Sequence, residues 1–156
     1  MSYEAVKLFF QENGLVDRLT LFDESSATVE LAAAAIGCEP RQIAKTLSFL
    51  VGDETILIVC AGDVKIDNPK YKAQFNTKAK MIPANQVEEK VGHPIGGVCP
   101  FAVNPDVHIY LDESLKTNDI IYPAAGARNS AAKLTIKELE SCLSNAIWID
   151  VCKPLT

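Results

Sequence analysis

Two apolar, β-branched runs stand next to each other in the first half of the chain, and they constrain the fold more than any other feature. Residues 42–51 read QIAKTLSFLV and residues 55–62 read TILIVCAG, with the turn residues GDE between them. Apolar runs of this length on either side of a short turn that contains glycine are typical of a β-hairpin. Their density predicts two central strands of a sheet that are buried on both faces.

Lys45 interrupts the apolar pattern of the first run. Burying an ammonium group without a partner is costly, so a lysine on an inner face usually holds an anion, holds a carbonyl group or has a catalytic role. Alternating polar and apolar residues are also the ordinary pattern of a half-buried strand, which would place Lys45 on the solvent side. The residues alone leave both interpretations open.

The remaining elements mix helices with hairpins and lack the regular βαβ alternation of a doubly wound sheet. Helical spacing, glycine stops and N-cap residues predict helices over residues 3–13, 69–76, 85–92 with Asn85 as its cap, and 134–144 with a Thr135/Glu138 capping box. In DESSATVELAAAAIG, a run of N-cap candidates precedes an alanine-rich helix that Gly37 closes. Further strands are expected at RLTLF, AKMIPA, VHIYLDESL, DIIYPAAG and AIWIDVC. The order predicts a mixed, largely antiparallel α/β (α+β) architecture, with residues 1–156 forming one domain.

Composition excludes several classes of protein. The chain has 156 residues, 48% of them hydrophobic and 22% charged, which is typical of a globular domain, and no apolar run is long enough to cross a bilayer. The N-terminal MSYEAVKLFFQENG alternates charged and apolar residues, unlike a signal peptide, so a cytoplasmic location is expected. Five cysteines without a close pair, and two histidines, indicate reduced thiols and no metal site. The sequence contains no glycine motif of the phosphate-binding type, so no nucleotide cofactor is expected.

The net charge of −5 argues against broad binding along a nucleic-acid backbone, including DNA, because that mode depends on many phosphate contacts. One stretch, VKIDNPKYKAQFNTKAK, nevertheless concentrates basic residues: Lys65, Lys70, Lys72, Lys78 and Lys80. They form either a local basic patch or an ordinary solvated helix face with its loop.

Two loop-like stretches have the composition of a binding site. In PIGGVCPFAV, Gly96 and Gly97 allow close approach of a ligand to the backbone, and exposed N–H groups there could bind an oxyanion. Cys99 could be a nucleophile, but no histidine stands close in sequence to activate it, and a small buried thiol is the commoner explanation. In YPAAGARNSAAKLT, small residues leave open space where a strand ends, and Arg128 supplies donors at its edge. Either stretch could instead be a plain turn.

Taken in order and spacing, ELAAAAIGCEPRQIAKTLSF, GGVCPFAV and YPAAGARNSAAKLTIKEL resemble the YbaK/EbsC family, the editing domains associated with or inserted in prolyl-tRNA synthetases. The resemblance extends from about Leu21 to Val151. Its most specific part is the lysine inside IAKTL combined with the later GG-V-x-P-F turn. It implies a compact mixed α+β domain with a barrel-like sheet flanked by helices, which hydrolyses the ester that joins a wrong amino acid to a tRNA.

The resemblance also implies roles for individual residues. Lys45 would be the catalytic-site cation that holds the aminoacyl or terminal-adenosine end. The substrate's own ribose hydroxyl and a bound water would assist, so neither a protein nucleophile nor a metal is needed. The pocket would be formed by Gly96, Gly97, Val98, Cys99, Pro100, Phe101, Ala124, Ala125, Gly126 and Arg128, and the five lysines of the basic stretch would contact the tRNA acceptor end. A synthetase could act as a partner.

Three departures leave the amino acid open. Ala124 and Ala125 replace a serine and glycines common in bacterial Cys-tRNA(Pro) deacylases, no acidic residue follows in RNSAAKL, and Cys99 stands where many relatives have serine. Alanine, cysteine, serine and threonine esters all remain candidates. Two other functions compete with an editing deacylase: a non-catalytic module that senses an amino acid or an aminoacyl-tRNA, and a small-molecule hydrolase that uses Cys99.

Overall fold

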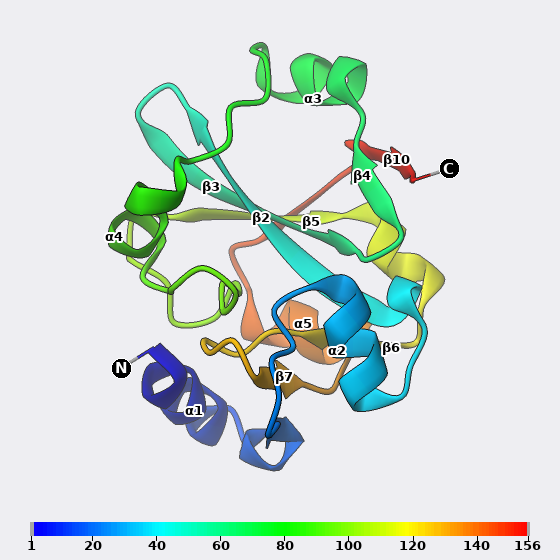
Figure 1. Cartoon of the computed structure of the whole chain (residues 1–156). Coiled ribbons are helices and arrows are strands. Elements are labelled where there is room, and N and C mark those ends of the chain that lie inside the picture. Colours follow the sequence, from blue (N-terminus) through cyan, green and yellow to red (C-terminus); the bar gives the residue numbers. More distant parts are fainter. Residues whose placement is uncertain (1, 156) are drawn as a thin grey trace.

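The computed structural model describes residues 2–155 and has a curled six-stranded sheet at its centre (Figure 1). The strand order is β8-β6-β2-β3-β5-β9. These strands are β2 (Ile43–Val51), β3 (Glu54–Ala61), β5 (His108–Asp112), β6 (Ile120–Pro123), β8 (Leu134–Thr135) and β9 (Ile147–Ile149). The pairs β2–β3 and β6–β8 are antiparallel, whereas β2–β6, β3–β5 and β5–β9 are parallel. The prediction of a mixed α+β fold with a barrel-like sheet is therefore confirmed. The expected largely antiparallel pairing does not hold for this sheet, in which three of the five strand pairs are parallel.

The predicted hairpin is confirmed as β2 and β3, which pair from Ala44–Ala61 to Val51–Glu54. Gly52 and Asp53 connect them, and Gly52 has a φ of 61°. A two-residue hairpin loop commonly needs a positive φ at its first position, and glycine adopts it without steric cost. β3 is buried from Thr55 onward, but the middle of β2 is only half-buried. Burial on both faces therefore holds for β3 and only partly for β2.

In the described part of the chain, five helices and two small ribbons surround the sheet. The helices are α1 (Ser2–Glu12), α2 (Val29–Ile36), α3 (Asn68–Phe75), α4 (Val87–Val91) and α5 (Ile136–Cys142). One antiparallel ribbon joins β1 (Leu19–Leu21) to β7 (Ser130–Ala132), and the other joins β4 (Val64–Ile66) to β10 (Cys152–Pro154). Short 3₁₀ turns occur at Val16–Arg18, Pro40–Gln42, Ala84–Gln86 and Glu113–Thr117.

Local signals located most helix ends correctly. The Thr135/Glu138 capping box is present at the start of α5, and α2 ends at Gly37 in the left-handed conformation. Asn85 is not the cap of α4, because residues 84–86 form a 3₁₀ turn and Gln86 occupies the N-cap position. The predicted strand AKMIPA is reduced to a single bridge between Phe49 and Met81.

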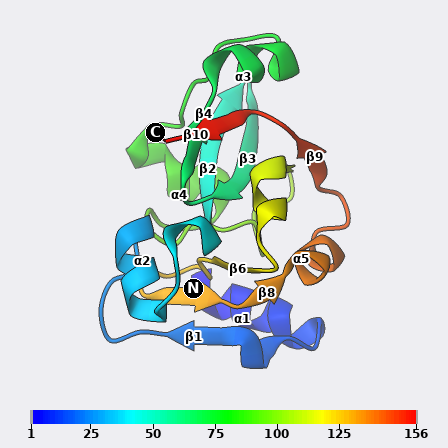
Figure 2. The same ribbon diagram turned by 90° about the vertical axis from the view of Figure 1, so that its right-hand side faces the viewer.

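The two faces of the β2–β3 hairpin bury different cores. Ala44 and Val59 belong to the core that contains α1 and α5 residues, whereas Phe49 and Cys60 belong to the core beneath α3. Figure 2 shows α3 with the β4–β10 ribbon at one end of the molecule and α1 with β1 at the other. Within residues 2–155, no helix is long and apolar enough to span a membrane.

Candidate functional site

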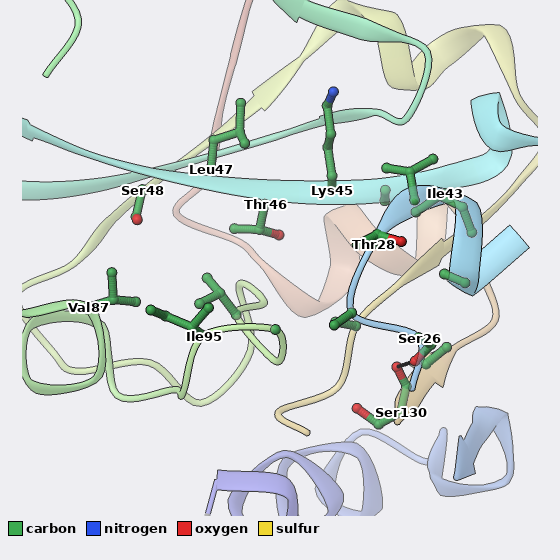
Figure 3. A pocket seen from close by; sticks show the side chains of 18 of the residues that line it. Ser26, Thr28, Ile43, Lys45, Thr46, Leu47, Ser48, Val87, Ile95 and Ser130 are labelled. Carbon is green, nitrogen blue, oxygen red and sulfur yellow. Dashed lines mark hydrogen bonds between the residues drawn. The ribbon is translucent and has the colours of Figure 1, made fainter. Parts of the chain in front are cut away.

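A cavity of about 500 Å³ opens beside the middle of β2 (Figure 3). Four further segments complete its walls: residues 26–32 leading into α2, residues 81–87, the turn at residues 95–98, and residues 122–131 between β6 and β7. The lining is mostly apolar. Ile95 and Met81 contribute to the lining and are 54% and 60% exposed, so they form a rim at the mouth.

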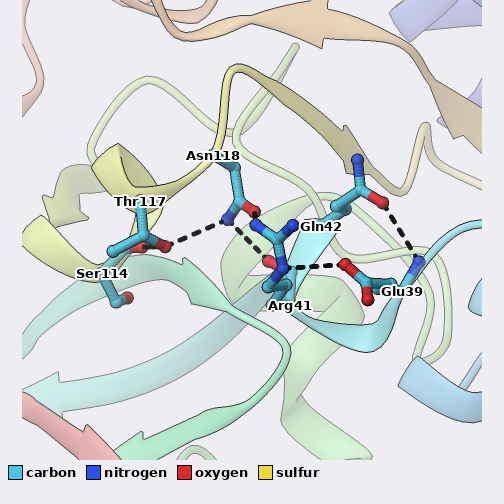
Figure 4. Close-up of polar contacts among 6 residues, drawn as sticks. All are labelled: Glu39, Arg41, Gln42, Ser114, Thr117 and Asn118. Atoms are coloured by element: carbon cyan, nitrogen blue, oxygen red, sulfur yellow. Dashed lines mark hydrogen bonds and ion pairs between the residues drawn. The ribbon is translucent and has the colours of Figure 1, made fainter.

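The arrangement at the start of β2 is fixed by a polar network (Figure 4). Nη1 of Arg41 donates to Oδ1 of Asn118 over 2.7 Å, and Nδ2 of Asn118 donates to the Arg41 carbonyl oxygen over 2.8 Å. Nε of Arg41 also donates to Oε2 of Glu39 over 2.9 Å. Because Asn118 precedes β6, the network holds β2 and β6 together where the cavity begins.

Lys45 lies on the face of β2 that packs toward α3, opposite to its neighbours. It is paired across the hairpin with Cys60, which is buried in the core beneath α3. Its ammonium group donates a hydrogen bond to the carbonyl oxygen of Val64 in β4. Figure 3 shows the Lys45 side chain directed away from Thr46 and Ser48, although the residue borders the cavity. The sequence analysis suggested an anion, a carbonyl group or a catalytic role for a buried Lys45. The structure contains the carbonyl partner.

The glycine-rich turn and the loop after β6, far apart in sequence, are packed against each other. The N–H of Gly126 donates to the carbonyl oxygen of Gly97 over 3.1 Å. A Cβ atom on Gly97 would lie 2.6 Å from the backbone nitrogen of Ala127, and one on Gly96 would lie 2.9 Å from Cγ of Arg128. The two loops therefore form one continuous wall that tolerates no side chain at residue 97.

The structure divides the predicted pocket residues into three groups. Lys45, Gly96, Val98 and Ala124 line the cavity. Arg128 is exposed beside Gly96, and Gly97 and Gly126 support the wall from behind. The remaining predicted residues are buried and do not line the cavity: Cys99, Pro100, Phe101 and Ala125.

Cys99 is enclosed in the core next to a histidine. Its Sγ lies 3.5 Å from Nε2 of His93 and 3.7 Å from the carbonyl oxygen of Phe101. The sequence analysis found no histidine close to Cys99 along the chain, but the turn brings His93, six residues away in sequence, against it. Burial nevertheless raises the pKa of the thiol to about 12 and lowers the pKa of the His93 imidazole. A protonated thiol outside the cavity is not an activated nucleophile.

Several polar side chains at the cavity were missed in the sequence analysis. Oγ of Ser130 accepts from the N–H groups of Ala125 and Ala127 over 3.0 and 3.1 Å, so it shapes the loop. Thr46 and Ser48 come from β2 and point toward the cavity (Figure 3). The alternation around Lys45 was the signal that could have found them, because residues two apart share a face of a strand.

The cavity lining contains no carboxylate, imidazole or thiol among the described residues. Among the residues that the structure describes, Lys45 is the only side chain of the lining with a formal charge, and its ammonium is held at Val64. Within residues 2–155, no group of three or more His, Cys, Asp or Glu side chains is placed to hold a metal ion.

All five lysines of the basic stretch are exposed. Lys70 is engaged within the molecule, since its ammonium lies 3.0 Å from Oδ1 of Asp150 and also donates to the Cys152 carbonyl oxygen. The hydrogen bond to Asp150 raises the pKa of Lys70. Lys78 and Lys80 belong to the segment that leads directly to Met81 at the cavity mouth.

Comparison with known proteins agrees with this architecture. Residues 23–142 match the model of the aminoacyl-tRNA editing domain. A Bacillus subtilis (strain 168) protein, YwhH, is 50% identical over 154 residues, which is 98% of each chain. The "Putative Cys-tRNA(Pro)/Cys-tRNA(Cys) deacylase EbsC" of Enterococcus faecalis (strain ATCC 700802 / V583) is 28% identical and covers 83% of this chain and 80% of its own. A proline–tRNA ligase of Bacillus velezensis (strain DSM 23117 / BGSC 10A6 / LMG 26770 / FZB42) is 27% identical over 57% of this chain, but only 16% of the ligase is covered.

Solved structures lead to the same conclusion. The crystal structure described as "a putative trans-editing enzyme for prolyl tRNA synthetase" superposes with a TM-score of 0.86 at 27% identity, covering 97% of both chains. That of the hypothetical protein APE2540 gives a TM-score of 0.85 at 27% identity, covering 96% of this chain and 99% of the other. The family match, the sequence relatives and the shared fold show that the chain belongs to the aminoacyl-tRNA editing domain family of YbaK and EbsC type.

Proposed function

We propose that the protein is a trans-editing deacylase, which hydrolyses the ester between a wrongly attached small amino acid and the 3′ end of a tRNA. The observation that carries this proposal is the cavity of about 500 Å³ between β2 and the two packed loops. A cavity of this size matches a small ligand rather than a protein surface. The names of the EbsC relative and of the trans-editing structure support the same activity.

The chemistry of the proposal relies on positioning and hydrogen bonding. Ester hydrolysis passes through an oxyanion, and one well-placed donor stabilises such a transition state by about 3 kcal/mol. Lys45 binds the tRNA 3′ end at the edge of β2, after its side chain rotates away from the Val64 carbonyl. The described lining contains no carboxylate, imidazole or thiol, so a water and the terminal ribose hydroxyl of the substrate carry the proton transfers. The proposal assigns no step to a metal ion or to Cys99.

The same proposal covers substrate selection and partners. A synthetase cannot fully exclude amino acids that differ by one methylene or hydroxyl, because such a group changes binding by only about 1–3 kcal/mol. Alanyl, cysteinyl, seryl and threonyl esters are the candidates that fit a lining of small residues. Residues 1–156 act as one editing domain in the cytoplasm, with tRNA held through Lys78 and Lys80 and a prolyl-tRNA synthetase as a possible source of the substrate.

The test is release of amino acid from a panel of mischarged tRNAs. We expect the wild-type protein to hydrolyse at least one ester faster than the spontaneous rate, and Lys45→Ala to lose most of that activity. Lys45→Arg tests whether the charge alone is sufficient. Lys137→Ala, an exposed lysine of α5 outside the cavity lining, is the matched control and should behave as wild type. Spontaneous rates with every ester would contradict the proposal.

One observation favours a second candidate. Because the described part of the lining contains no carboxylate, imidazole or thiol, the cavity could serve a module that binds an amino acid or aminoacyl-tRNA without hydrolysing it. Saturable binding of a non-hydrolysable aminoacyl-adenosine amide, together with no turnover of the matching ester, would select this alternative.

A further inference from the structure

The hydrogen bonding along one edge of β2 is interrupted beside the cavity. At its start, β2 pairs with β6 through Ile43 and Ala44. Farther on, the carbonyl oxygen of Ser48 accepts from the N–H of Ile82 over 3.2 Å, and the N–H of Leu50 donates to the carbonyl oxygen of Lys80 over 2.9 Å. Within residues 2–155, no main-chain partner occupies the interval between these two paired segments.

The unpaired groups in this interval point toward the cavity. In an extended strand, the N–H and C=O of one residue point to the same side, and successive residues point to opposite sides. Ser48 and Leu50 use the edge away from β3, so the N–H and C=O of Thr46 point to that edge too. The open edge therefore offers the N–H and C=O of Thr46 and the N–H of Ser48.

The side chain of Thr46 adds an unsatisfied group at the same place. Its Oγ1 is buried and has no hydrogen-bond partner among the described residues. Two other hydroxyls of the cavity are engaged: Ser26 donates to the Arg128 carbonyl oxygen, and Thr28 accepts from the N–H of Leu31. Buried polar groups without a partner are rare and require an explanation. Here the polar groups left unused by the fold are gathered at Thr46 and at the neighbouring N–H of Ser48.

We propose that the aminoacyl group of the substrate lies along this open edge, and that Thr46 selects a small amino acid with a side-chain hydroxyl. The inference rests on the proposed deacylase function and names its substrate class, seryl or threonyl esters. The N–H of Ser48 donates to the ester carbonyl oxygen, as in the pairing of a parallel strand. The C=O of Thr46 accepts from the α-ammonium, for which the described lining offers no carboxylate. Oγ1 of Thr46 pairs with the substrate hydroxyl.

The other candidate esters leave this hydroxyl unsatisfied. Alanine has no polar atom in its side chain, and a cysteine thiol is only a weak donor and acceptor. A site that hydrogen-bonds a substrate hydroxyl discriminates strongly against the analogue that lacks it, because its own buried group then remains unpaired. A purely apolar cavity of this size would show little preference within such a pair.

The experiment compares two pairs of tRNA esters that differ by one hydroxyl: seryl with alanyl, and threonyl with 2-aminobutyryl. We expect kcat/KM to be at least about tenfold higher for the hydroxylated member of each pair. Thr46→Val, which is nearly isosteric, should bring both ratios close to one. Thr46→Ser restores the hydroxyl and should restore the ratios. Thr55→Val removes a buried hydroxyl from β3 outside the cavity lining and should leave the ratios at their wild-type values.

Two readouts separate failure of this inference from failure of the proposed function. Equal kcat/KM values within each pair, with turnover above the spontaneous rate, would overturn the role of Thr46 and leave the deacylase standing. If no ester is hydrolysed, calorimetry with 3′-seryl and 3′-alanyl amides of 3′-amino-3′-deoxyadenosine tests recognition separately. Tighter binding of the seryl amide, lost in Thr46→Val, supports the inference, and equal binding of the two amides overturns it.

Discussion

The thiol of Cys99 lies 3.5 Å from Nε2 of His93, and both side chains are fully buried outside the cavity lining. A cysteine next to a histidine is the arrangement of a thiol nucleophile, but here burial raises the pKa of the thiol to about 12 and lowers that of the imidazole. The pair is therefore a neutral part of the core.

Replacing Cys99 by serine tests this directly. We expect deacylation by Cys99→Ser to stay within about threefold of wild type, because the thiol takes no part in the reaction. Reaction of the native protein with a thiol reagent near neutral pH should leave Cys99 unmodified, as mass spectrometry of peptides would show. Loss of all activity in Cys99→Ser, with an unchanged melting temperature, would support a cysteine hydrolase instead.

His93 should make stability depend on pH. Its Nε2 lies 2.6 Å from the Phe101 carbonyl oxygen, so this nitrogen carries the proton, while Nδ1 accepts from the hydroxyl of Ser2. Burial lowers the folded-state pKa below 6.5, and the unfolded chain therefore binds more protons below that pH. Stability is fully present above about pH 6.5 and is lost as the pH falls toward the folded-state pKa.

Thermal melts between about pH 7.5 and about pH 5 measure this effect. In His93→Gln the melting temperature should fall less with acidification than in the wild type. The variant should also be less stable than the wild type overall. His108→Gln is the control, because His108 is exposed and lies 3.9 Å from Glu54. A His93→Gln profile parallel to that of the wild type would show that another group is responsible.

Gly97→Ala should disturb the cavity wall. The added Cβ would meet the backbone of Gly126 and Ala127 at 2.6–2.9 Å, and overpacking of this kind costs about 1–3 kcal/mol. We expect a lower melting temperature and a lower kcat/KM. Gly52→Ala in the β2–β3 turn adds strain at a φ of 61° but meets no atom within 4 Å, so it should lower stability and leave kcat/KM unchanged. Equal kinetics in the two variants would argue against a shared wall.

Lys80→Ala tests whether the basic stretch contacts tRNA. Removing one phosphate contact should weaken binding of all tRNAs to a similar degree and reduce the dependence of log Kd on log salt by about one unit. Filter binding at several salt concentrations measures both, with Lys137→Ala as the control. An unchanged salt slope in Lys80→Ala would assign Lys80 to the solvated surface alone.

Sequence patterns predicted the elements whose determinants are local. The β2–β3 hairpin follows from two apolar runs and a glycine turn, and the start of α5 follows from Thr135 and Glu138. The ribbon of β4 and β10 was not predicted, because a three-residue strand such as Val64–Ile66 is too short to show a periodic pattern. Each of the two strands also depends on the other for its pairing.

The site was predictable only in part. Alternation showed that Lys45 and Thr46 occupy opposite faces of a strand, but it could not show which face borders a cavity. Family resemblance directed attention to Lys45, whereas the unsatisfied hydroxyl belongs to Thr46. The contact of Gly97 with Gly126, and that of Cys99 with His93, depend on how the loops fold back over the sheet, which spacing in the sequence does not encode.

The two sides of the cavity mouth differ in how freely they can change during evolution. The wall at Gly97 and Gly126 is held by main-chain contact, so a larger residue at 97 requires a change in the backbone of Gly126 and Ala127, and a larger residue at 126 would meet Ser2 of α1. Met81 and Ile95 are more than half exposed, and they can be exchanged without repacking the core. Divergence toward new substrates should therefore proceed through the rim, with the glycine wall inherited as a unit.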